Sequence, residues 1–493
     1  MRYLGRMTDD ARQATQTRET HPAEPHTSPA ATYRARVERF GLERDRHLQR
    51  ALALSRARLA TFLAAVAFFL AAEWASEATV GALNAGGALF LVAFIVLVVA
   101  HGRERERVAW FTALRELNHE ALHRLRRDWD ALPVRGGPAP PDHPYAVDLD
   151  LFGHASVLQL LGTVATTRGR DRLAAWLLEP APPGEIADRQ AAVRELASRI
   201  QLRDELAARG RLVGDVPAPA IERFLAWAED EPWLLHRPLL IWSARVIPLL
   251  TIGLIIAHAA GRTDQPWWIA PLAAAILLTA LTGRQVTTTF ERAAAGELRF
   301  SRYGELLEIL CDAEFRAPAL RRLQEDLSAH GQSAHRQIRR LALILSFAEA
   351  RGWAVIYLAI QLLTLWDLHV LHALEHWQIR AGRHVRRWID ALARADALAA
   401  IAALAFDHPD WTFPEVRTAE PPILRAEQLG HPLLPEEERV ANDVEVGPPG
   451  SFLLVTGSNM SGKSTLLRAI GVNVVLAQAG APVCARSLVL PPL

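Results

Sequence analysis

The stretch "SFLLVTGSNMSGKSTLLRAIG", residues 451–471, decides how the rest of the chain is interpreted. From Gly457 to Ser464 it fits the phosphate-binding pattern G-x-x-x-x-G-K-[ST]. The apolar residues 452–455 before the pattern predict a buried strand, and the residues after it predict a helix. A glycine loop at that place turns backbone N–H groups and the positive end of the helix toward an anion. The stretch therefore predicts a nucleotide site and the start of a P-loop α/β ATPase domain.

The pattern also predicts the chemistry of the site. Lys463 is expected to reach the β- and γ-phosphates of ATP, and the Ser464 hydroxyl is expected to ligate Mg²⁺. Lys463 is the single lysine of a chain whose other basic residues are arginines. ATP and Mg²⁺ are therefore the predicted ligands. The residues expected to bind the nucleotide are Gly457, Ser458, Asn459, Met460, Ser461, Gly462, Lys463, Ser464 and Thr465.

Composition narrows the classes of protein. The formal net charge of +1 gives no overall argument for a nucleic-acid partner. Hydrophobic residues make up 50 % of the chain, which favours membrane segments. The two cysteines, Cys311 and Cys484, are far apart and lack metal-ligand spacing, which argues against a disulfide framework or a zinc site.

Four apolar segments predict two membrane hairpins. Residues 59–72 and 80–100 form the first pair, and residues 238–260 and 266–282 form the second. A helix of about 20 apolar residues spans the hydrocarbon core of a bilayer. The third segment is the weakest because it contains Arg245. The alternative is that the shorter segments are helices of a buried core.

Basic flanks orient these hairpins. Arginines lie before and after the first hairpin and after the second, so the turns are expected outside and the rest of the chain in the cytoplasm. The predicted location is therefore the inner, or cytoplasmic, membrane, crossed several times. The flanking arginines are Arg56, Arg58, Arg103, Arg105, Arg107, Arg284 and Arg292.

The chain is predicted to be multidomain. The parts outside the hairpins have helical periodicity, and Pro180, Pro182 and Pro183 break it between Glu179 and Glu185. The predicted divisions are a disordered polar tail (1–50), the first transmembrane hairpin (51–110), a linker (111–146), the first part of a helical core (147–237), the second hairpin (238–284), core and lever helices (285–410) and the start of the ATPase domain (411–493).

Two polar clusters in the second helical part have alternative interpretations. Arg336, Arg339 and Arg340 share one helix face and could contact DNA phosphates, or they could form a solvated face.

The second cluster contains three histidines, His369, His372 and His376, which share a face near Asp367 and Glu375. They could bind a metal ion, although their order differs from H-E-x-x-H, or they could form a polar helix face.

The sequence around the loop resembles the MutS family of mismatch-repair ATPases. "TGSNMSGKSTLLRAIGVNVVLAQAGAPVCA" (456–485) is similar to that family's TGPNMGGKST loop with the helix and strand behind it. "HPLL" (431–434) and "VANDV" (440–444) resemble the lead-in to its ATPase domain. Residues 151–196 are similar to the start of its helical core, and "WIDALARADALAAIAALAF" (388–406) to the end of its lever helices.

This resemblance implies an all-α MutS-like core with lever helices, ATP hydrolysis in the complete protein, a homodimer formed through the ATPase domain, and DNA as a partner. Ser458 and Ser461 stand where the family usually has Pro and Gly, and the first hairpin replaces the domain that wedges into a mismatch. The family's Walker B carboxylates, signature segment and late histidine would follow the loop, but 28 residues follow Thr465. The chain is therefore expected to be truncated.

Three functions fit these observations. The first is a membrane-anchored MutS-like ATPase that couples ATP binding to engagement of DNA. The second is a membrane-associated, ATP-dependent scaffold or binding protein that does not act on DNA. The third is a transporter of the ABC type, which ranks last because four spans separated by a soluble core make a poor translocation pathway.

Overall fold

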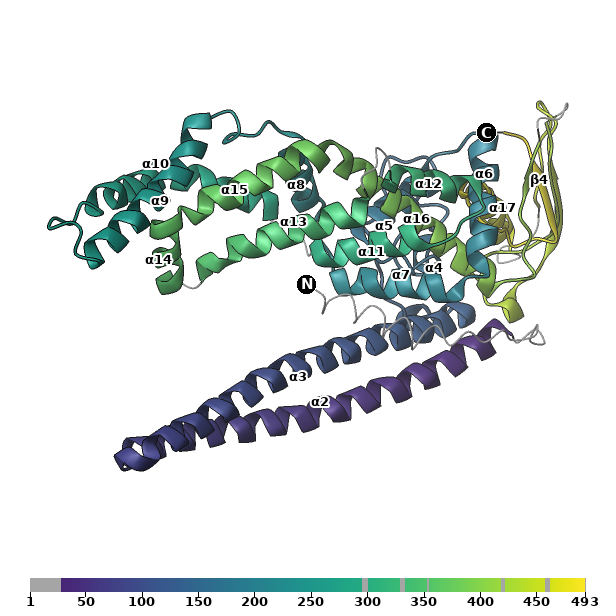
Figure 1. Ribbon diagram of the computed structural model, residues 1–493. Coiled ribbons are helices and arrows are strands. Elements are labelled where there is room, and N and C mark those ends of the chain that lie inside the picture. The colour runs from purple at the N-terminus through teal and green to yellow at the C-terminus, as the bar shows by residue number, and fades with distance from the viewer. Residues whose placement is uncertain are drawn as a thin grey trace.

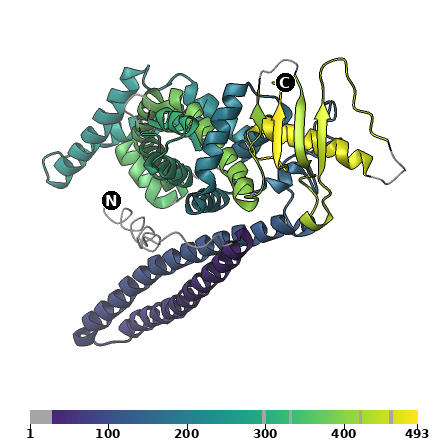
Figure 2. The same cartoon turned by 90° about the vertical axis from the view of Figure 1, so that its right-hand side faces the viewer.

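The computed structural model describes residues 28–294, 300–328, 333–352, 354–417, 422–456 and 462–492. Most of these residues are helical, and one small sheet lies toward the C-terminal end (Figure 1). Two helical hairpins project away from the sheet, on the same side of the helical body in both views (Figures 1 and 2). The apolar hairpins and the sheet therefore lie at opposite ends of the molecule.

The first hairpin pairs two long helices, α2 (Pro29–Glu73) and α3 (Glu77–Arg126). On α2 the buried side chains Tyr33, Phe40 and His47 recur every seven residues, which is the spacing of coiled-coil packing. The base of the hairpin is thus held together by side-chain packing, whereas most side chains toward its turn are exposed.

Two expected boundaries in this region are wrong. The expected polar tail (1–50) is helical from Pro29 onward, because the seven-residue repeat packs this part of α2 against α3. The expected linker (111–146) begins inside α3, which continues to Arg126 and is followed by the short helix η1 (Trp129–Ala131).

The second hairpin consists of α9 (Pro238–Ala259) and α10 (Ile269–Ala294). By length and composition, α2, α3, α9 and α10 are all able to cross a membrane. Only 6 % of the residues in the apolar windows of α2 and α3 are buried, and only 17 % in those of α9 and α10. The four helices are therefore apolar but exposed, which disagrees with the alternative of buried core helices.

The helical core is built from segments on both sides of the second hairpin. The prolines at 180–183 do separate two helices, since one ends at Leu178 and the next begins at Pro183. The helices of this helical body are α4 (Val157–Leu160), α5 (Thr167–Leu178), α6 (Pro183–Ala197), α7 (Ile200–Val213), α8 (Ala218–Glu229), α11 (Phe300–Asp312), α12 (Pro318–Ser328), α13 (Ala334–Ala348), η3 (Glu349–Gly352) and α14 (Ala354–Thr364).

A long helical run then passes through the core toward the sheet. It comprises α15 (Trp366–Trp377), the π-helical turn η4 (Gln378–Gly382) and α16 (Arg383–Asp407). A Cβ atom at Gly382 would lie 1.9 Å from the carbonyl oxygen of Ala228, so glycine allows the run to touch α8 there. Alanine-rich α16 is buried along most of its length and packs against α5, α6 and α12.

The four-stranded sheet has the order β1-β4-β2-β3. Strand β4 (Ser487–Leu490) is parallel to β1 (Glu415–Val416) and antiparallel to β2 (Leu424–Leu429), and β2 is antiparallel to β3 (Asn442–Val446). Between β3 and β4 lies α17 (Lys463–Ala479), which packs on α5 and α6 of the core. The short helix η5 (Glu436–Glu438) joins β2 to β3.

Candidate functional site

The predicted nucleotide loop ends at the start of α17. Gly462 has φ +80°, a left-handed conformation suited to glycine, and it is the residue that precedes the first turn of the helix. Lys463 is half-buried in that turn, while Ser464 and Thr465 are exposed. The N-terminal end of a helix of this length attracts anions through its free N–H groups. The other predicted loop residues, Gly457, Ser458, Asn459, Met460 and Ser461, lie outside the described residues.

The prediction of a buried strand before the loop is wrong. Residues 451–456 pair with none of the four described strands. Phe452 is 86 % exposed and Leu454 is 73 % exposed. The described sheet consists of β1, β4, β2 and β3, and none of these strands shares backbone hydrogen bonds with this apolar segment.

Buried side chains fix the position of α17. Asn473 is fully buried, donates from Nδ2 to the Gly430 carbonyl oxygen at 2.9 Å, and accepts from the Cys484 backbone N–H at Oδ1 at 2.7 Å. One amide thereby ties the helix to the two neighbouring segments that follow β2 and precede β4. At the other end, Arg189 of α6 donates from Nη1 to the Gln478 carbonyl oxygen at 3.1 Å. The helix that carries Lys463 is therefore held by both the sheet and the core.

The lead-in at 431–434 adjoins this helix. His431 is buried and accepts the Leu433 backbone N–H at Nδ1, at 3.2 Å, so it shapes its own turn. Burial lowers the pKa of His431, which favours the neutral ring that this bond needs. Residues 442–444 of the second lead-in form the start of β3.

A junction of three elements lies beneath the site. Arg127, just after α3, donates to the Pro432 carbonyl oxygen from Nε at 3.0 Å and lies 3.1 Å from His408 Nε2 through Nη2. His408 follows α16 and stacks on Trp411 at 4.4 Å. Burial, together with Arg127, Arg439 and other arginines, lowers the pKa of His408 to about 2, so its neutral ring accepts from Arg127. The end of the first hairpin, the end of α16 and the lead-in therefore meet at one point.

A second contact connects α2, the other helix of the hairpin, to the same end of α16. The Tyr33 hydroxyl of α2 donates to Asp407 Oδ1 at 2.5 Å, and Arg124 Nη2 of α3 lies 3.6 Å from Asp407 Oδ2. Burial and the nearby carboxylate raise the pKa of Tyr33 well above its ordinary value, so the hydroxyl remains a donor. Asp407, the last residue of α16, thus joins both helices of the hairpin.

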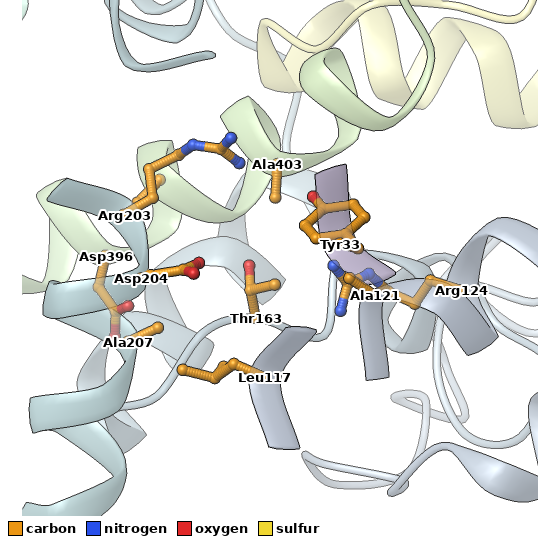
Figure 3. Close-up of a pocket in the computed structure, with 11 residues that line it drawn as sticks. Tyr33, Leu117, Ala121, Arg124, Thr163, Arg203, Asp204, Ala207, Asp396 and Ala403 are labelled. Carbon is orange, nitrogen blue, oxygen red and sulfur yellow. The ribbon is translucent and has the colours of Figure 1, made fainter. Parts of the chain in front are cut away.

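Figure 3 shows the small cavity beside this contact, with Tyr33, Arg124 and Thr163 around it. Its volume is about 20 Å³, which is room for a water molecule and far too little for a nucleotide. Three buried polar atoms near it have no protein partner among the described residues: Arg124 Nη1, Thr163 Oγ1 and Arg203 Nε. The cavity is therefore a water-sized gap in the hairpin–core contact and not a second substrate site.

A further buried carboxylate secures α16 to the core. Asp396 accepts the backbone N–H of Thr166 at 2.9 Å and its hydroxyl at 2.7 Å, at the N-terminus of α5. Burial raises the pKa of Asp396, and the hydrogen bonds oppose that shift. Sequence periodicity marks Asp396 only as a polar residue in an alanine-rich helix, so this role could not be read from the chain.

The two polar clusters differ in their surroundings. Arg336, Arg339 and Arg340 are exposed on α13, as a phosphate-contacting or a solvated face requires, and Arg339 is paired with Glu308 at 2.5 Å.

The histidine cluster on α15 does not converge on one point. His369 Nε2 lies 3.1 Å from the Ala244 carbonyl oxygen, and His376 Nδ1 lies 3.0 Å from the His372 carbonyl oxygen. The nearby Glu375 accepts backbone N–H groups of Trp233, Leu234 and Leu235. Within the described parts of the chain, no group of three His, Cys, Asp or Glu residues is placed to hold a metal ion.

Comparison with known proteins gives partial matches. The chain is 36 % identical over 112 residues to a probable DNA mismatch repair protein Msh6 of Drosophila melanogaster, 38 % identical over 100 residues to a DNA mismatch repair protein MutS of Chloroflexus aurantiacus, and 41 % identical over 58 residues to an endonuclease MutS2 of Bacillus velezensis. These partial matches support a relationship with the MutS family.

The matched stretches cover 22 %, 20 % and 12 % of this chain. They span 9 %, 10 % and 7 % of the MutS-family relatives, so the chain matches about a tenth of their length. No family model matches the chain. The names of the relatives support a DNA-related, MutS-like function at the level of the family.

Proposed function

We propose that the chain is the membrane-anchored, nucleotide-binding part of a MutS-like ATPase, with ATP and Mg²⁺ at the N-terminus of α17. The observation that carries the proposal is the first turn of that helix. The left-handed Gly462 precedes Lys463 and Ser464, on a helix fixed from both sides by Asn473 and Arg189. These residues fit an ammonium that reaches phosphate oxygens and a hydroxyl that ligates Mg²⁺.

Coupling to the rest of the protein is proposed to pass through the junction. The lead-in beside α17 contacts Arg127, and Arg127 contacts His408 at the end of α16. A change in the position of α17 on nucleotide binding would therefore act on the long helical run and on the first hairpin together. A homodimer through the ATPase domains would bring two such sites together.

Membrane anchoring is supported by the four exposed apolar helices. Contiguous apolar surface on this scale is rare on soluble monomers and marks contact with a membrane or a partner. With the flanking arginines on the cytoplasmic side, the helical body and the sheet would face the cytoplasm of a multi-pass protein of the inner membrane.

The decisive experiment is a titration with labelled ATP and Mg²⁺. Lys463→Ala and Lys463→Arg are each expected to weaken binding at least tenfold, about 1.4 kcal/mol, because the planar guanidinium does not replace a compact ammonium in a tight cradle. Arg468→Ala, on the exposed side of the same helix, is the matched control and is expected to leave affinity unchanged. Equal affinity for wild type and both Lys463 variants would refute the nucleotide site.

The same proteins separate the two leading functions. If the ATPase engages DNA, duplex binding should depend on nucleotide in the wild type, should lose that dependence in Lys463→Ala, and should fall steeply with salt. Nucleotide binding without any duplex binding would instead identify an ATP-dependent scaffold at the membrane.

A further inference from the structure

The end of the helical body that lies away from the sheet carries an exposed apolar surface beside the second hairpin. Its side chains are Leu343 and Phe347 on α13 and Leu358, Ile360 and Leu363 on α14, and we call these five residues the tip surface. Leu358 is 56 % exposed, Phe347 46 % and Leu343 42 %.

Helix α14 is too short to cross a membrane. Its sequence, AVIYLAIQLLT, contains no charge, and its 11 residues would extend only about 17 Å against a hydrocarbon core of about 30 Å. Apolar helices of this length are either buried in a core or lie at a membrane interface. The exposure of Leu358 and Leu363 disagrees with a buried core helix.

Contacts with the second hairpin define the depth of α14. Gln361 is buried and donates from Nε2 to Thr279 Oγ1 of α10 at 3.1 Å. Thr279 belongs to the apolar part of α10, and α14 packs against both α9 and α10. In Figure 1, α14 lies at the same end of the molecule as these two helices. The short helix is therefore level with the cytoplasmic end of the proposed membrane span.

Polar contacts lie on the core side of that level. Arg351 pairs with Asp367 at 2.5 Å and donates to Thr287 Oγ1 at 3.1 Å, and the Tyr357 hydroxyl donates to Asp367 at 2.6 Å. Thr287 is eight residues nearer the core than Thr279, which is about 12 Å along α10. The transition from polar to apolar contacts therefore occurs over the thickness of a membrane interface.

One face of α13 shows the same transition. Arg336, Arg340, Leu343 and Phe347 follow one another at helical spacing, and all four are exposed. The face thus changes from basic to apolar toward the tip. At its end, Trp366 donates from Nε1 to the Phe347 carbonyl oxygen at 3.1 Å, and tryptophan is enriched at membrane interfaces.

We propose that the tip surface is immersed in the cytoplasmic leaflet, with Arg336 and Arg340 at the level of anionic phospholipid headgroups. The proposal rests on the membrane anchoring proposed above. A DNA-binding face would be expected to stay basic or polar along its length, whereas this face becomes apolar within one turn of Arg340. The third arginine, Arg339, is already paired with Glu308. The long helical run that starts beside the tip would then be held by lipid at one end.

The test places a fluorophore at single cysteines of the full chain in nanodiscs, in a background of Cys311→Ser and Cys484→Ala. The labelled positions are Leu343→Cys and Leu358→Cys on the tip surface, Leu249→Cys on α9 as the report of hairpin insertion, and Ser328→Cys on α12 as an exposed control. Lipids carry nitroxide quenchers either at the headgroup or deep in the acyl chains. Tip positions should lose fluorescence to the shallow quencher, Leu249→Cys to the deep one, and Ser328→Cys to neither.

The outcomes separate the two proposals. Quenching at position 249 without quenching at 343 and 358 overturns the immersed tip and leaves membrane anchoring intact. Absence of quenching at 249 overturns both. A fluorophore at 343 that responds to duplex DNA, and not to lipid quenchers, overturns the tip proposal in favour of a nucleic-acid face.

The headgroup contact has its own control. With anionic lipids, Arg340→Gln should lower the equilibrium constant for immersion, read from shallow quenching at position 343, about fivefold, which corresponds to about 1 kcal/mol for one arginine near the surface. Arg321→Gln, an exposed arginine of α12, should change nothing. Equal effects of the two variants would overturn the assignment of Arg340 to headgroups.

Discussion

Replacing Asp407 by alanine should release the first hairpin from the end of α16. The substitution removes the acceptor of the Tyr33 hydroxyl at 2.5 Å and the carboxylate 3.6 Å from Arg124, whose side chain is 3 % exposed. Losing a hydrogen bond to a charged group costs about 1.5–3 kcal/mol, and leaving a buried charge unpaired costs about 3–5 kcal/mol. Because both contacts use one carboxylate, the costs overlap, and we expect about 3–5 kcal/mol in total.

Thermal unfolding in detergent, followed by tryptophan fluorescence, measures this loss. Asp407→Asn keeps an acceptor for Tyr33 and should cost less than Asp407→Ala, while the exposed Asp142→Ala should be neutral. Hydrogen exchange should rise in the first turns of α2 in the Asp407 variants, since these turns are held by Tyr33.

A double-mutant cycle tests the reasoning directly. Tyr33→Phe alone should cost about 1–2 kcal/mol, and much less in the Asp407→Ala background, because its partner is then absent. If Tyr33→Phe costs the same in both backgrounds, or if Asp407→Ala unfolds like the wild type, the contact does not hold the hairpin.

Two further predictions concern the junction and α17. Because the folded pKa of His408 is about 2 and an unfolded histidine titrates near 6.5, the unfolded state binds the extra proton between these values, so stability should fall as pH drops below about 6.5, by up to about 1.4 kcal/mol per unit. His408→Gln should flatten this slope in unfolding measured at pH 4 to 8; an unchanged slope would contradict the neutral ring. Asn473→Ala should cost about 2–4 kcal/mol by leaving the Cys484 N–H and the Gly430 carbonyl oxygen unsatisfied, and it should weaken ATP binding, whereas the exposed Asn442→Ala should do neither.

The helices could be predicted well from the sequence where the signal is local. Apolar length predicted α9 and α10, and the prolines near 180–183 predicted the break between α5 and α6. The polar composition of the first fifty residues favours a disordered tail, whereas α2 begins at Pro29. Its signal was present in the seven-residue spacing of Tyr33, Phe40 and His47.

The strand expected at 452–455 shows the opposite error. An apolar run before a glycine loop is typical of a buried strand, but a strand exists only where neighbours supply hydrogen bonds and cover its faces. Here no strand of the described sheet pairs with these residues.

The contacts that organise the site are beyond local patterns. Tyr33 and Asp407 are separated by 374 positions, and Arg127 and Pro432 by 305. Neither pair follows a periodicity, so a single sequence gives no reason to connect them. For α17, the glycine and lysine of its first turn were predictable, whereas the clamp made by Asn473 needed the structure.

The close contact between Gly382 and Ala228 gives the long helical run a pivot point. From Gly382, one arm reaches about 24 Å to Trp366 beside the tip surface, and the other reaches about 38 Å to Asp407 near the lead-in to α17. If the run rotates about this contact as a rigid body, a tilt of about 5° moves the end of the short arm by about 2 Å and the end of the long arm by about 3 Å in the opposite direction. If lipid holds the Trp366 end, a movement of the Asp407 end on nucleotide binding would have to displace lipid at the other end. Membrane tension and nucleotide occupancy would then both change the tilt of the same helical run.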